Sequence, residues 1–302
     1  MNAHPHQRIL VTGAASGIGA AVARHLSQQG HQVILADIDA DALQAQVDRL
    51  LADGLDAVSR RLDVRSWDDC SATMSWIESH VGALDGLVQC AGVIYLGQPW
   101  DEQDGQRVQH LLAVNLLGTY QMGALALGHM KAKGRGAIVN FSSGAQAGMA
   151  GCAAYCASKA GVAGLTYAWA LDVAGTGVRV NALCPVATTP MTEQTNAYLR
   201  QRGQLSGSRP YIDPAVNAPA VAFLLSERAA HVTGQVLRVH ENQLQLLSHP
   251  AVALPVMIPA GPTVDAIAEA LDTGFPGGLM PLGLCGAEIR HAPLAKSHQV
   301  PR

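Results

Sequence analysis

Short runs of β-branched and other apolar residues alternate with longer segments of helical periodicity along most of this 302-residue chain. Such alternation predicts a parallel sheet with right-handed crossovers, covered by helices on both faces, with ligands at the carboxyl ends of the strands. We therefore expect an α/β fold built on a doubly wound sheet of about seven strands. The expected strands lie near residues 8–12, 32–36, 57–62, 85–90, 136–142, 178–184 and 235–240, and the expected helices near 17–29, 40–53, 67–80, 103–132, 154–174 and 214–226.

The composition changes after Ser248, where a segment rich in proline, glycine and alanine begins. We expect residues 1–248 to form one domain, and residues 249–302 to form an extension that packs on that domain or on a neighbouring subunit. Residues 244–247 can fold back as an antiparallel edge strand. Residues 263–271 have the pattern of a short amphipathic helix, too short to be stable alone. A partly disordered appendage is the alternative.

Charge and cysteine content restrict the possible functions. The net charge is -3 and only 14% of residues are charged, so no electrostatic footprint for nucleic acid is present. The N-terminus lacks the apolar core of a signal peptide, and no uninterrupted apolar run is long enough to span a bilayer. We therefore expect a cytoplasmic protein without membrane contact. The cysteines show no disulfide-framework spacing and the histidines no metal-ligand spacing, so we expect reduced thiols and no metal site.

The first expected strand leads into a glycine-rich turn, Thr12-Gly13-Ala14-Ala15-Ser16-Gly17-Ile18-Gly19. Glycines here permit a tight turn and let backbone N–H groups approach a pyrophosphate at the start of the next helix. Asp37 follows about twenty residues on, where a carboxylate can accept hydrogen bonds from both adenosine ribose hydroxyls. No arginine or lysine offsets its repulsion of a 2′-phosphate, so the sequence favours NAD(H) over NADP(H). Alternatively Asp37 caps the following helix, although Asp39 is also placed to do so.

Lys159 is the single charged residue between Gly136 and Leu171. It follows Tyr155 by four positions in an apolar helical segment, so the two side chains share one helical face. The ammonium group there would favour the phenolate and lower the pKa of Tyr155 from its ordinary value of about 10. Such a tyrosine exchanges protons near neutral pH. A lysine that snorkels from the edge of the helix is the alternative.

In this order the motifs resemble those of the short-chain dehydrogenase/reductase family, over about residues 8–240. The resemblance rests on the glycine turn, Asp63-Val64, Cys90-Ala91-Gly92, Asn115, Ser142-Ser143 and Tyr155-x-x-x-Lys159. It implies a Rossmann-type fold that binds a nicotinamide dinucleotide, and a homodimer or homotetramer. The cofactor-binding residues that it implies are Gly13, Ser16, Gly17, Ile18, Gly19, Asp37, Asp63, Val64, Ala91, Gly92, Tyr155, Lys159, Pro185 and Thr189.

The resemblance also implies a role for each candidate catalytic residue. Tyr155 would be the general acid/base, and Lys159 would bind the nicotinamide ribose and support the tyrosinate. Asn115 would anchor a water for proton relay, and a serine would orient the substrate oxygen. Counting from the preceding strand makes Ser143 that serine, whereas counting back from Tyr155 gives Ser142. We prefer Ser143, because strand register fixes side-chain direction while loops absorb deletions.

Two positions depart from the family pattern. Cys90 stands in place of the usual asparagine, which removes a polar strut between strands, and Val186 stands in place of a glycine after Pro185. Neither change removes a reacting group.

The expected substrate pocket is mostly apolar, which favours a hydrophobic alcohol or ketone. Its candidate lining residues are Val93, Ile94, Tyr95, Ala145, Met149, Cys152, Met191 and Tyr198, under a polar lid at about residues 192–208 that carries Arg200 and Arg202, with Arg209 just beyond. The predicted function is NAD(H)-dependent interconversion of a secondary alcohol and a ketone. The alternatives are a 3-hydroxyacyl/3-oxoacyl thioester dehydrogenase or reductase, for which the arginines would bind a phosphate-bearing acyl carrier, and a non-catalytic dinucleotide-binding regulator.

Overall fold

The computed structural model describes residues 6–101, 105–240, 242–250, 263–273 and 284, and the chain divides into two compact units, Met1–Leu247 and Ser248–Arg302. In the second unit, helix α9 spans Val264–Thr273, close to the helix expected at 263–271. Its apolar residues Val264, Ile267 and Leu271 are exposed. The remainder of the expected extension lies mainly outside the described residues.

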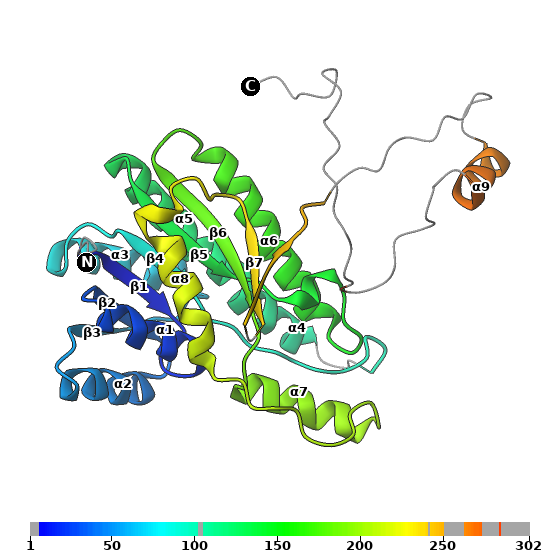
Figure 1. Cartoon of the computed structure of the whole chain (residues 1–302), viewed down its shortest axis with the longest axis horizontal. Coiled ribbons are helices and arrows are strands. Elements are labelled where there is room, and N and C mark those ends of the chain that lie inside the picture. The colour runs from blue at the N-terminus through cyan, green and yellow to red at the C-terminus, as the bar shows by residue number, and fades with distance from the viewer. Residues whose placement is uncertain (1–5, 102–104, 241, 251–262, 274–283, 285–302) are drawn as a thin grey trace. The chain divides into compact units, whose positions relative to one another are not determined.

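The first unit is built on an eight-stranded sheet in the order β3-β2-β1-β4-β5-β6-β7-β8 (Figure 1). All neighbouring strands run parallel except β7 and β8, which form an antiparallel hairpin. The α/β prediction and the antiparallel edge strand are therefore confirmed. The strands are β1 Arg8–Thr12, β2 Gln32–Asp37, β3 Ala57–Arg61, β4 Gly86–Gln89, β5 Gly136–Phe141, β6 Val178–Pro185, β7 Val236–His240 and β8 Gln243–Leu247.

Alternate residues of the strands feed two cores, one on each face of the sheet. On one face, Ile9 and Val11 of β1 pack with helices α1, α2 and α8. On the other face, Leu10 packs with α3, α5 and α6. The helices of this unit are α1 Gly17–Gln28, α2 Ala40–Ala52, α3 Trp67–His80, α4 Gly105–Leu112, α5 Gly118–Lys133, α6 Ala153–Asp172, α7 Pro190–Gln201 and α8 Ala218–Leu225.

Three helical segments differ from the expectation. The helix expected at 103–132 is divided by a π-helical turn, Ala113–Leu117, which separates α4 from α5. The helix expected at 214–226 starts with a 3-10 turn, Pro214–Asn217. Helix α7 lies where a lid without secondary structure was expected. Thr189 caps it by accepting a hydrogen bond from the Thr192 N–H, and Pro190 occupies its first turn, a combination that marks a helix start.

One helical stretch within the described residues, Gly105–Lys133, is long and apolar enough to cross a membrane. Its residues Met122, Ala126 and Met130 are fully buried in the core against the sheet. Packing on the sheet accounts for these buried apolar residues, while Leu117 and Tyr120 of the same stretch are exposed.

Strands β1 and β4 are neighbours in the sheet, although two other strands separate them in the sequence. The chain order reverses between them, which opens a crevice at the carboxyl ends of the strands. The glycine turn after β1 and the Cys90-Ala91-Gly92 segment after β4 both reach this crevice.

Candidate active site

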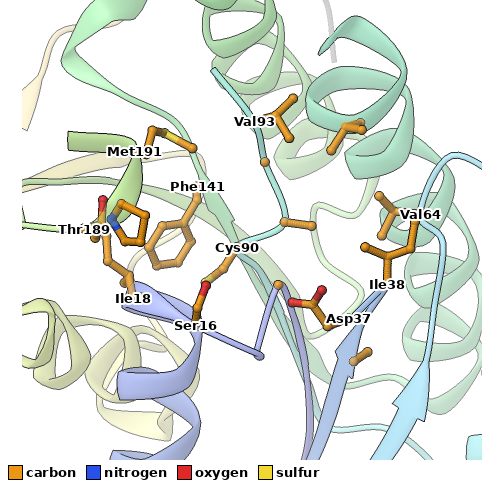
Figure 2. Close-up of a pocket in the computed structure, with 18 of the residues that line it drawn as sticks. Ser16, Ile18, Asp37, Ile38, Val64, Cys90, Val93, Phe141, Thr189 and Met191 are labelled. Atoms are coloured by element: carbon orange, nitrogen blue, oxygen red, sulfur yellow. The ribbon is translucent and has the colours of Figure 1, made fainter. Parts of the chain in front are cut away.

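A cavity of about 420 Å³ lies at the carboxyl edge of the sheet, walled by the loops that follow β1, β2, β3, β4, β5 and β6. All fourteen residues predicted to bind the cofactor line it. Figure 2 shows Asp37, Ile38 and Val64 on one side of the cavity, and Phe141, Thr189 and Met191 on the opposite side. Lining residues that the sequence analysis missed are Ala36, Ile38, Leu62, Arg65, His110, Val114, Phe141 and Pro190; Cys90 and Ser142, which it discussed without assigning them to the cofactor site, also line the cavity.

The glycines of the first turn are required by close backbone packing. Gly13 has φ of +68°, and a Cβ atom there would lie 2.6 Å from the Ala91 nitrogen. A Cβ atom on Gly19 would lie 2.1 Å from the Gly13 carbonyl oxygen. Helix α1 begins at Gly17, so its amino end is presented to the cavity with little side-chain cover. This geometry fits a pyrophosphate, which binds backbone N–H groups at the positive end of a helix.

The carboxylate of Asp37 stands beside this turn. It accepts hydrogen bonds from the backbone N–H of Ala15 at 3.0 Å and from that of Asp39 at 3.1 Å. Asp39, not Asp37, caps helix α2 by accepting a hydrogen bond from the Ala42 N–H at 3.0 Å. The capping alternative for Asp37 is therefore wrong, and its carboxylate lines the cavity.

One charged group on the cavity wall, that of Arg65, was not expected. The guanidinium of Arg65 donates to both carboxylate oxygens of Asp63, at 2.6 to 3.2 Å, and lies 3.1 Å from the Nδ1 atom of His110. This hydrogen bonding holds the pKa of Asp63 below its ordinary value. Arg65 follows the Asp63-Val64 pair directly, so its place in the sequence could have indicated it.

Helix α6 carries Tyr155 and Lys159 into the cavity, where both are buried. Burial raises the pKa of Tyr155 to about 12, although a hydrogen bond from Ser143 acts in the opposite direction. Burial also lowers the pKa of Lys159 to about 8. The Nζ atom of Lys159 donates to the Phe141 carbonyl at 2.8 Å and lies 5.7 Å from the centre of the Tyr155 ring.

The expected lowering of the Tyr155 pKa is therefore wrong for this structure. The ammonium group donates to a backbone carbonyl, and loss of hydration is the largest effect on the Tyr155 pKa. Tyr155 is a neutral phenol at neutral pH in this arrangement.

The two candidate serines have different partners. The hydroxyl of Ser142 lies 2.8 Å from the Lys159 carbonyl oxygen and 2.8 Å from Oε1 of Gln146. Ser143 is hydrogen-bonded to Tyr155, and its Oγ also accepts the Ala145 N–H at 3.2 Å. The hydrogen bond to Tyr155 supports Ser143 as the catalytic serine, whereas Ser142 is the one that lines the cavity, and the choice between them stays a prediction.

Asn115 lies in the π-helical turn and is fully buried. Its side chain accepts from the Val93 N–H at 2.8 Å and donates to the Val93 carbonyl at 2.9 Å. It also donates to the Ser158 hydroxyl at 3.2 Å. A Cβ atom on Gly92 would lie 3.4 Å from the Asn115 Oδ1 and 3.7 Å from the Lys159 Nζ. Asn115 therefore fixes the loop after β4 close to Lys159, while its water-anchoring role stays a prediction.

Cys90 stands where the family usually has an asparagine, so no side-chain amide joins the strands at this position. A buried chain of hydrogen bonds between other polar side chains joins them instead. Gln89 donates to the Asn140 Oδ1 at 2.9 Å, and Asn140 donates to the Thr166 hydroxyl at 2.9 Å. This chain links β4, β5 and α6. Cys90 itself is tied to β1 through its backbone N–H, which donates to the Thr12 carbonyl at 3.2 Å.

The predicted substrate-pocket residues divide into three groups. Val93 and Met191 line the cavity. A buried apolar cluster around Tyr155, against which Tyr95 packs, includes Ile94, Ala145 and Cys152. Met149 is exposed, and Tyr198 of α7 lies against Gly151. The apolar wall is thus formed mainly next to Tyr155, while Arg200, Arg202 and Arg209 are exposed.

Comparison with known proteins identifies the family. Residues 7–200 match the family described as short chain dehydrogenase. The chain belongs to the short-chain dehydrogenase family. The matched residues include strands β1 to β6 and the Tyr155–Lys159 pair.

Several proteins resemble this short-chain dehydrogenase over most of their length. Cis-4-hydroxycyclohexanecarboxylate dehydrogenase of Sinomonas cyclohexanicum is 40% identical over 236 residues, which cover 76% of this chain and 93% of that protein. 2-(S)-hydroxypropyl-CoM dehydrogenase 3 of Xanthobacter autotrophicus is 36% identical, covering 76% and 94%. Among solved structures, an actinorhodin polyketide ketoreductase with NADPH has a TM-score of 0.73 at 32% identity, covering 78% and 95%. A short chain dehydrogenase from Mycobacterium avium has a TM-score of 0.79 at 27% identity, covering 93% and 98%.

Proposed function

We propose that this short-chain dehydrogenase interconverts a secondary alcohol and a ketone with NAD(H), and that Tyr155 is its general acid/base. The observation that carries the proposal is the composition of one cavity. It is lined by the glycine turn, by Asp37, and by Tyr155 with Lys159. Ser143 hydrogen-bonds Tyr155. A dinucleotide site and a proton-transfer group therefore share one cavity.

The residues beside Tyr155 suit proton transfer to a substrate oxygen. Ser143 donates to the phenol oxygen and thus favours the phenolate, against the desolvation that raises its pKa. With a substrate oxygen present, the Ser143 hydroxyl would orient it and stabilise its developing charge. The nicotinamide supplies the hydride exchange when it is bound.

Preference for NAD(H) is argued from Asp37. Its carboxylate lines the cavity beside the glycine turn, where it would bind ribose hydroxyls and repel a 2′-phosphate. Arg65 also lines the cavity, and its guanidinium is engaged in a close ion pair with Asp63. The similar ketoreductase structure with NADPH makes the opposite preference the direct alternative.

The substrate is proposed to be a hydrophobic secondary alcohol or ketone, because the wall next to Tyr155 is apolar. The names of the two dehydrogenase relatives, each of a hydroxylated compound, support this class. A 3-hydroxyacyl or 3-oxoacyl thioester is the second candidate. The polyketide ketoreductase among the structural relatives and the exposed Arg200 and Arg202 of α7 favour it.

A turnover screen tests the proposal. NAD is offered with a panel of secondary alcohols and, separately, with 3-hydroxyacyl thioesters, and NADH formation is followed by absorbance. We expect turnover with apolar alcohols. Turnover with thioesters alone would move the assignment to the second candidate, and cofactor binding without any turnover would support a non-catalytic regulator.

We further propose that the protein is a cytoplasmic homodimer or homotetramer. Leu171 at the end of α6, and Leu244 and Leu246 on β8, are large apolar residues that stay exposed in the single chain. Association of subunits would cover such residues. Light scattering decides the oligomeric state, and a monomer at micromolar concentration would overturn this proposal.

A further inference from the structure

Two cysteine side chains touch each other beside Tyr155. The Sγ atoms of Cys152 and Cys156 are 3.5 Å apart, and both thiols contact the backbone of Met149. The Met149 N–H donates to the Cys156 sulfur at 3.2 Å, while Cys152 donates to the Met149 carbonyl at 3.3 Å. Sulfur contacts of this kind are unusual for isolated buried thiols, which pack as small apolar groups.

The short distance between the two sulfurs permits a covalent bond between them. Cys152 precedes helix α6 as its N-terminal flanking residue, and the Cys156 N–H donates to the Cys152 carbonyl at 2.9 Å. Cys152 lies outside the regular helix, with φ of -149° and ψ of +45°, so the position of its side chain is not fixed by helical spacing. The sulfurs must approach each other by only about 1.5 Å to reach bonding distance.

The two thiols differ in access. Cys152 is 2% exposed, whereas Cys156 is half-buried and can be reached from solvent. Burial, together with the neighbouring Cys156, raises the pKa of Cys152 to about 12. An external reagent would therefore meet Cys156 first, and Cys152 would act as the resolving thiol.

We propose that Cys152 and Cys156 form a thiol–disulfide site that closes in the presence of a low-molecular-weight disulfide and changes the substrate end of the cavity. In the first step the Cys156 thiolate attacks glutathione disulfide, forming a mixed disulfide and releasing one glutathione thiolate. The Cys152 thiolate then attacks the Cys156 sulfur, the protein disulfide forms, and a second glutathione thiolate leaves. The protein loses two electrons and two thiol protons, and glutathione disulfide gains the two electrons.

The consequence for the cavity follows from the packing of Cys152. It belongs to the buried cluster that contains Tyr155 and Ala145 and that Met191 contacts. Drawing Cys152 towards Cys156 pulls on this cluster and ends the hydrogen bonds of both thiols to Met149. The substrate wall is altered, while the glycine turn and Asp37 belong to other loops.

Peptide mass analysis tests the chemistry without reference to turnover. Trypsin cleaves after Arg135 and Lys159, so a single peptide holds Cys152 and Cys156 and none of the other four cysteines. After incubation of the full chain with glutathione disulfide, we expect this peptide to have lost two hydrogens, reversibly with dithiothreitol. Cys152→Ser should instead retain one glutathione on Cys156, and Cys156→Ser should leave the peptide unmodified. A wild-type peptide that stays reduced, or that keeps glutathione without an internal bond, would overturn the proposal.

The effect on the cavity is measured by kinetics and rests on the proposed function. For the oxidised protein we expect kcat/KM for the alcohol to fall by about tenfold to a hundredfold, the scale for a displacement of about 1 Å near the reacting groups. Cofactor affinity should be unchanged. Cys70→Ser is the matched control, because Cys70 lies on the buried face of α3 and its loss should leave both the cross-link and the inhibition intact. An internal disulfide with unchanged kcat/KM would refute the effect on the cavity. If the reduced protein turns over no alcohol, the proposed function fails, while the peptide still decides the cross-link.

Discussion

The hydroxyl oxygen of Ser142 lies 2.8 Å from the backbone carbonyl oxygen of Lys159. It thereby connects the end of strand β5 to the helix turn that carries the candidate catalytic lysine. Its neighbour Ser143 instead hydrogen-bonds the phenol of Tyr155. The adjacent serines thus have different partners, and we expect Ser142 to hold the helix and Ser143 to act at the reacting oxygen.

Paired alanine variants separate these tasks. Ser143→Ala should lower kcat by about a hundredfold or more, since it removes a donor aimed at the developing charge. Ser142→Ala should keep most of kcat and lower the free energy of unfolding by about 1–3 kcal/mol, because the buried Lys159 carbonyl loses a donor. Steady-state kinetics and urea denaturation of both variants check this. The reverse pattern would make Ser142 the catalytic serine.

The Asp37→Asn variant tests the choice of cofactor. Asparagine keeps one oxygen that can accept the Ala15 N–H, while the negative charge and the acceptor of the Asp39 N–H are lost. Wild-type protein should have a higher kcat/KM with NAD than with NADP. Asp37→Asn should reduce the ratio of these two kcat/KM values by about tenfold to a hundredfold, since each 1.4 kcal/mol is about tenfold. Kinetics with both cofactors measure this. A wild-type preference for NADP would contradict the assignment.

The lowered pKa of Lys159 has a consequence for stability. Between about pH 8 and the ordinary lysine pKa of 10.5, the unfolded chain binds a proton that the folded chain has lost. The free energy of unfolding due to Lys159 therefore rises with pH across that window. At pH 7 this effect should make the free energy of unfolding of Lys159→Met greater than that of wild type by up to about 3 kcal/mol. The difference should shrink by about pH 10.

Urea denaturation of the cofactor-free wild type and Lys159→Met at several pH values measures that difference. Tyr155, whose raised pKa lowers stability only above its ordinary value, is present in both proteins and cancels. A stability difference that is flat from pH 7 to about pH 10 would show that the Lys159 pKa is not lowered.

The sequence was sufficient for the sheet, the glycine turn and the position of Tyr155 and Lys159, because these depend on local periodicity and spacing. It was insufficient for partners that meet only after folding. Examples are the Arg65–His110 contact, across 45 positions, and the chain from Gln89 through Asn140 to Thr166. The direction of the Tyr155 pKa was also missed, since desolvation depends on how deeply the folded protein buries the phenol.

Helix α7 was missed for a different reason. Its moderately polar sequence lacks a strong apolar stripe, and its one clear signal was the Thr189-Pro190 start. The π-helical turn at Asn115 has no comparable signal. It inserts where Asn115 bonds to Val93, and that partner lies in another loop.

The proposed role of Tyr155 is the central claim, and one comparison of two variants tests it most directly. Tyr155→Phe removes the phenol from the cavity, and Tyr167→Phe makes the same change three turns further along helix α6. With NAD and the best alcohol from the screen, kcat of Tyr155→Phe should fall by about a hundredfold or more, the scale of general acid/base help. Its affinity for the cofactor, measured by fluorescence titration, should stay near that of wild type, and Tyr167→Phe should keep its kcat. Wild-type kcat in Tyr155→Phe would contradict the account.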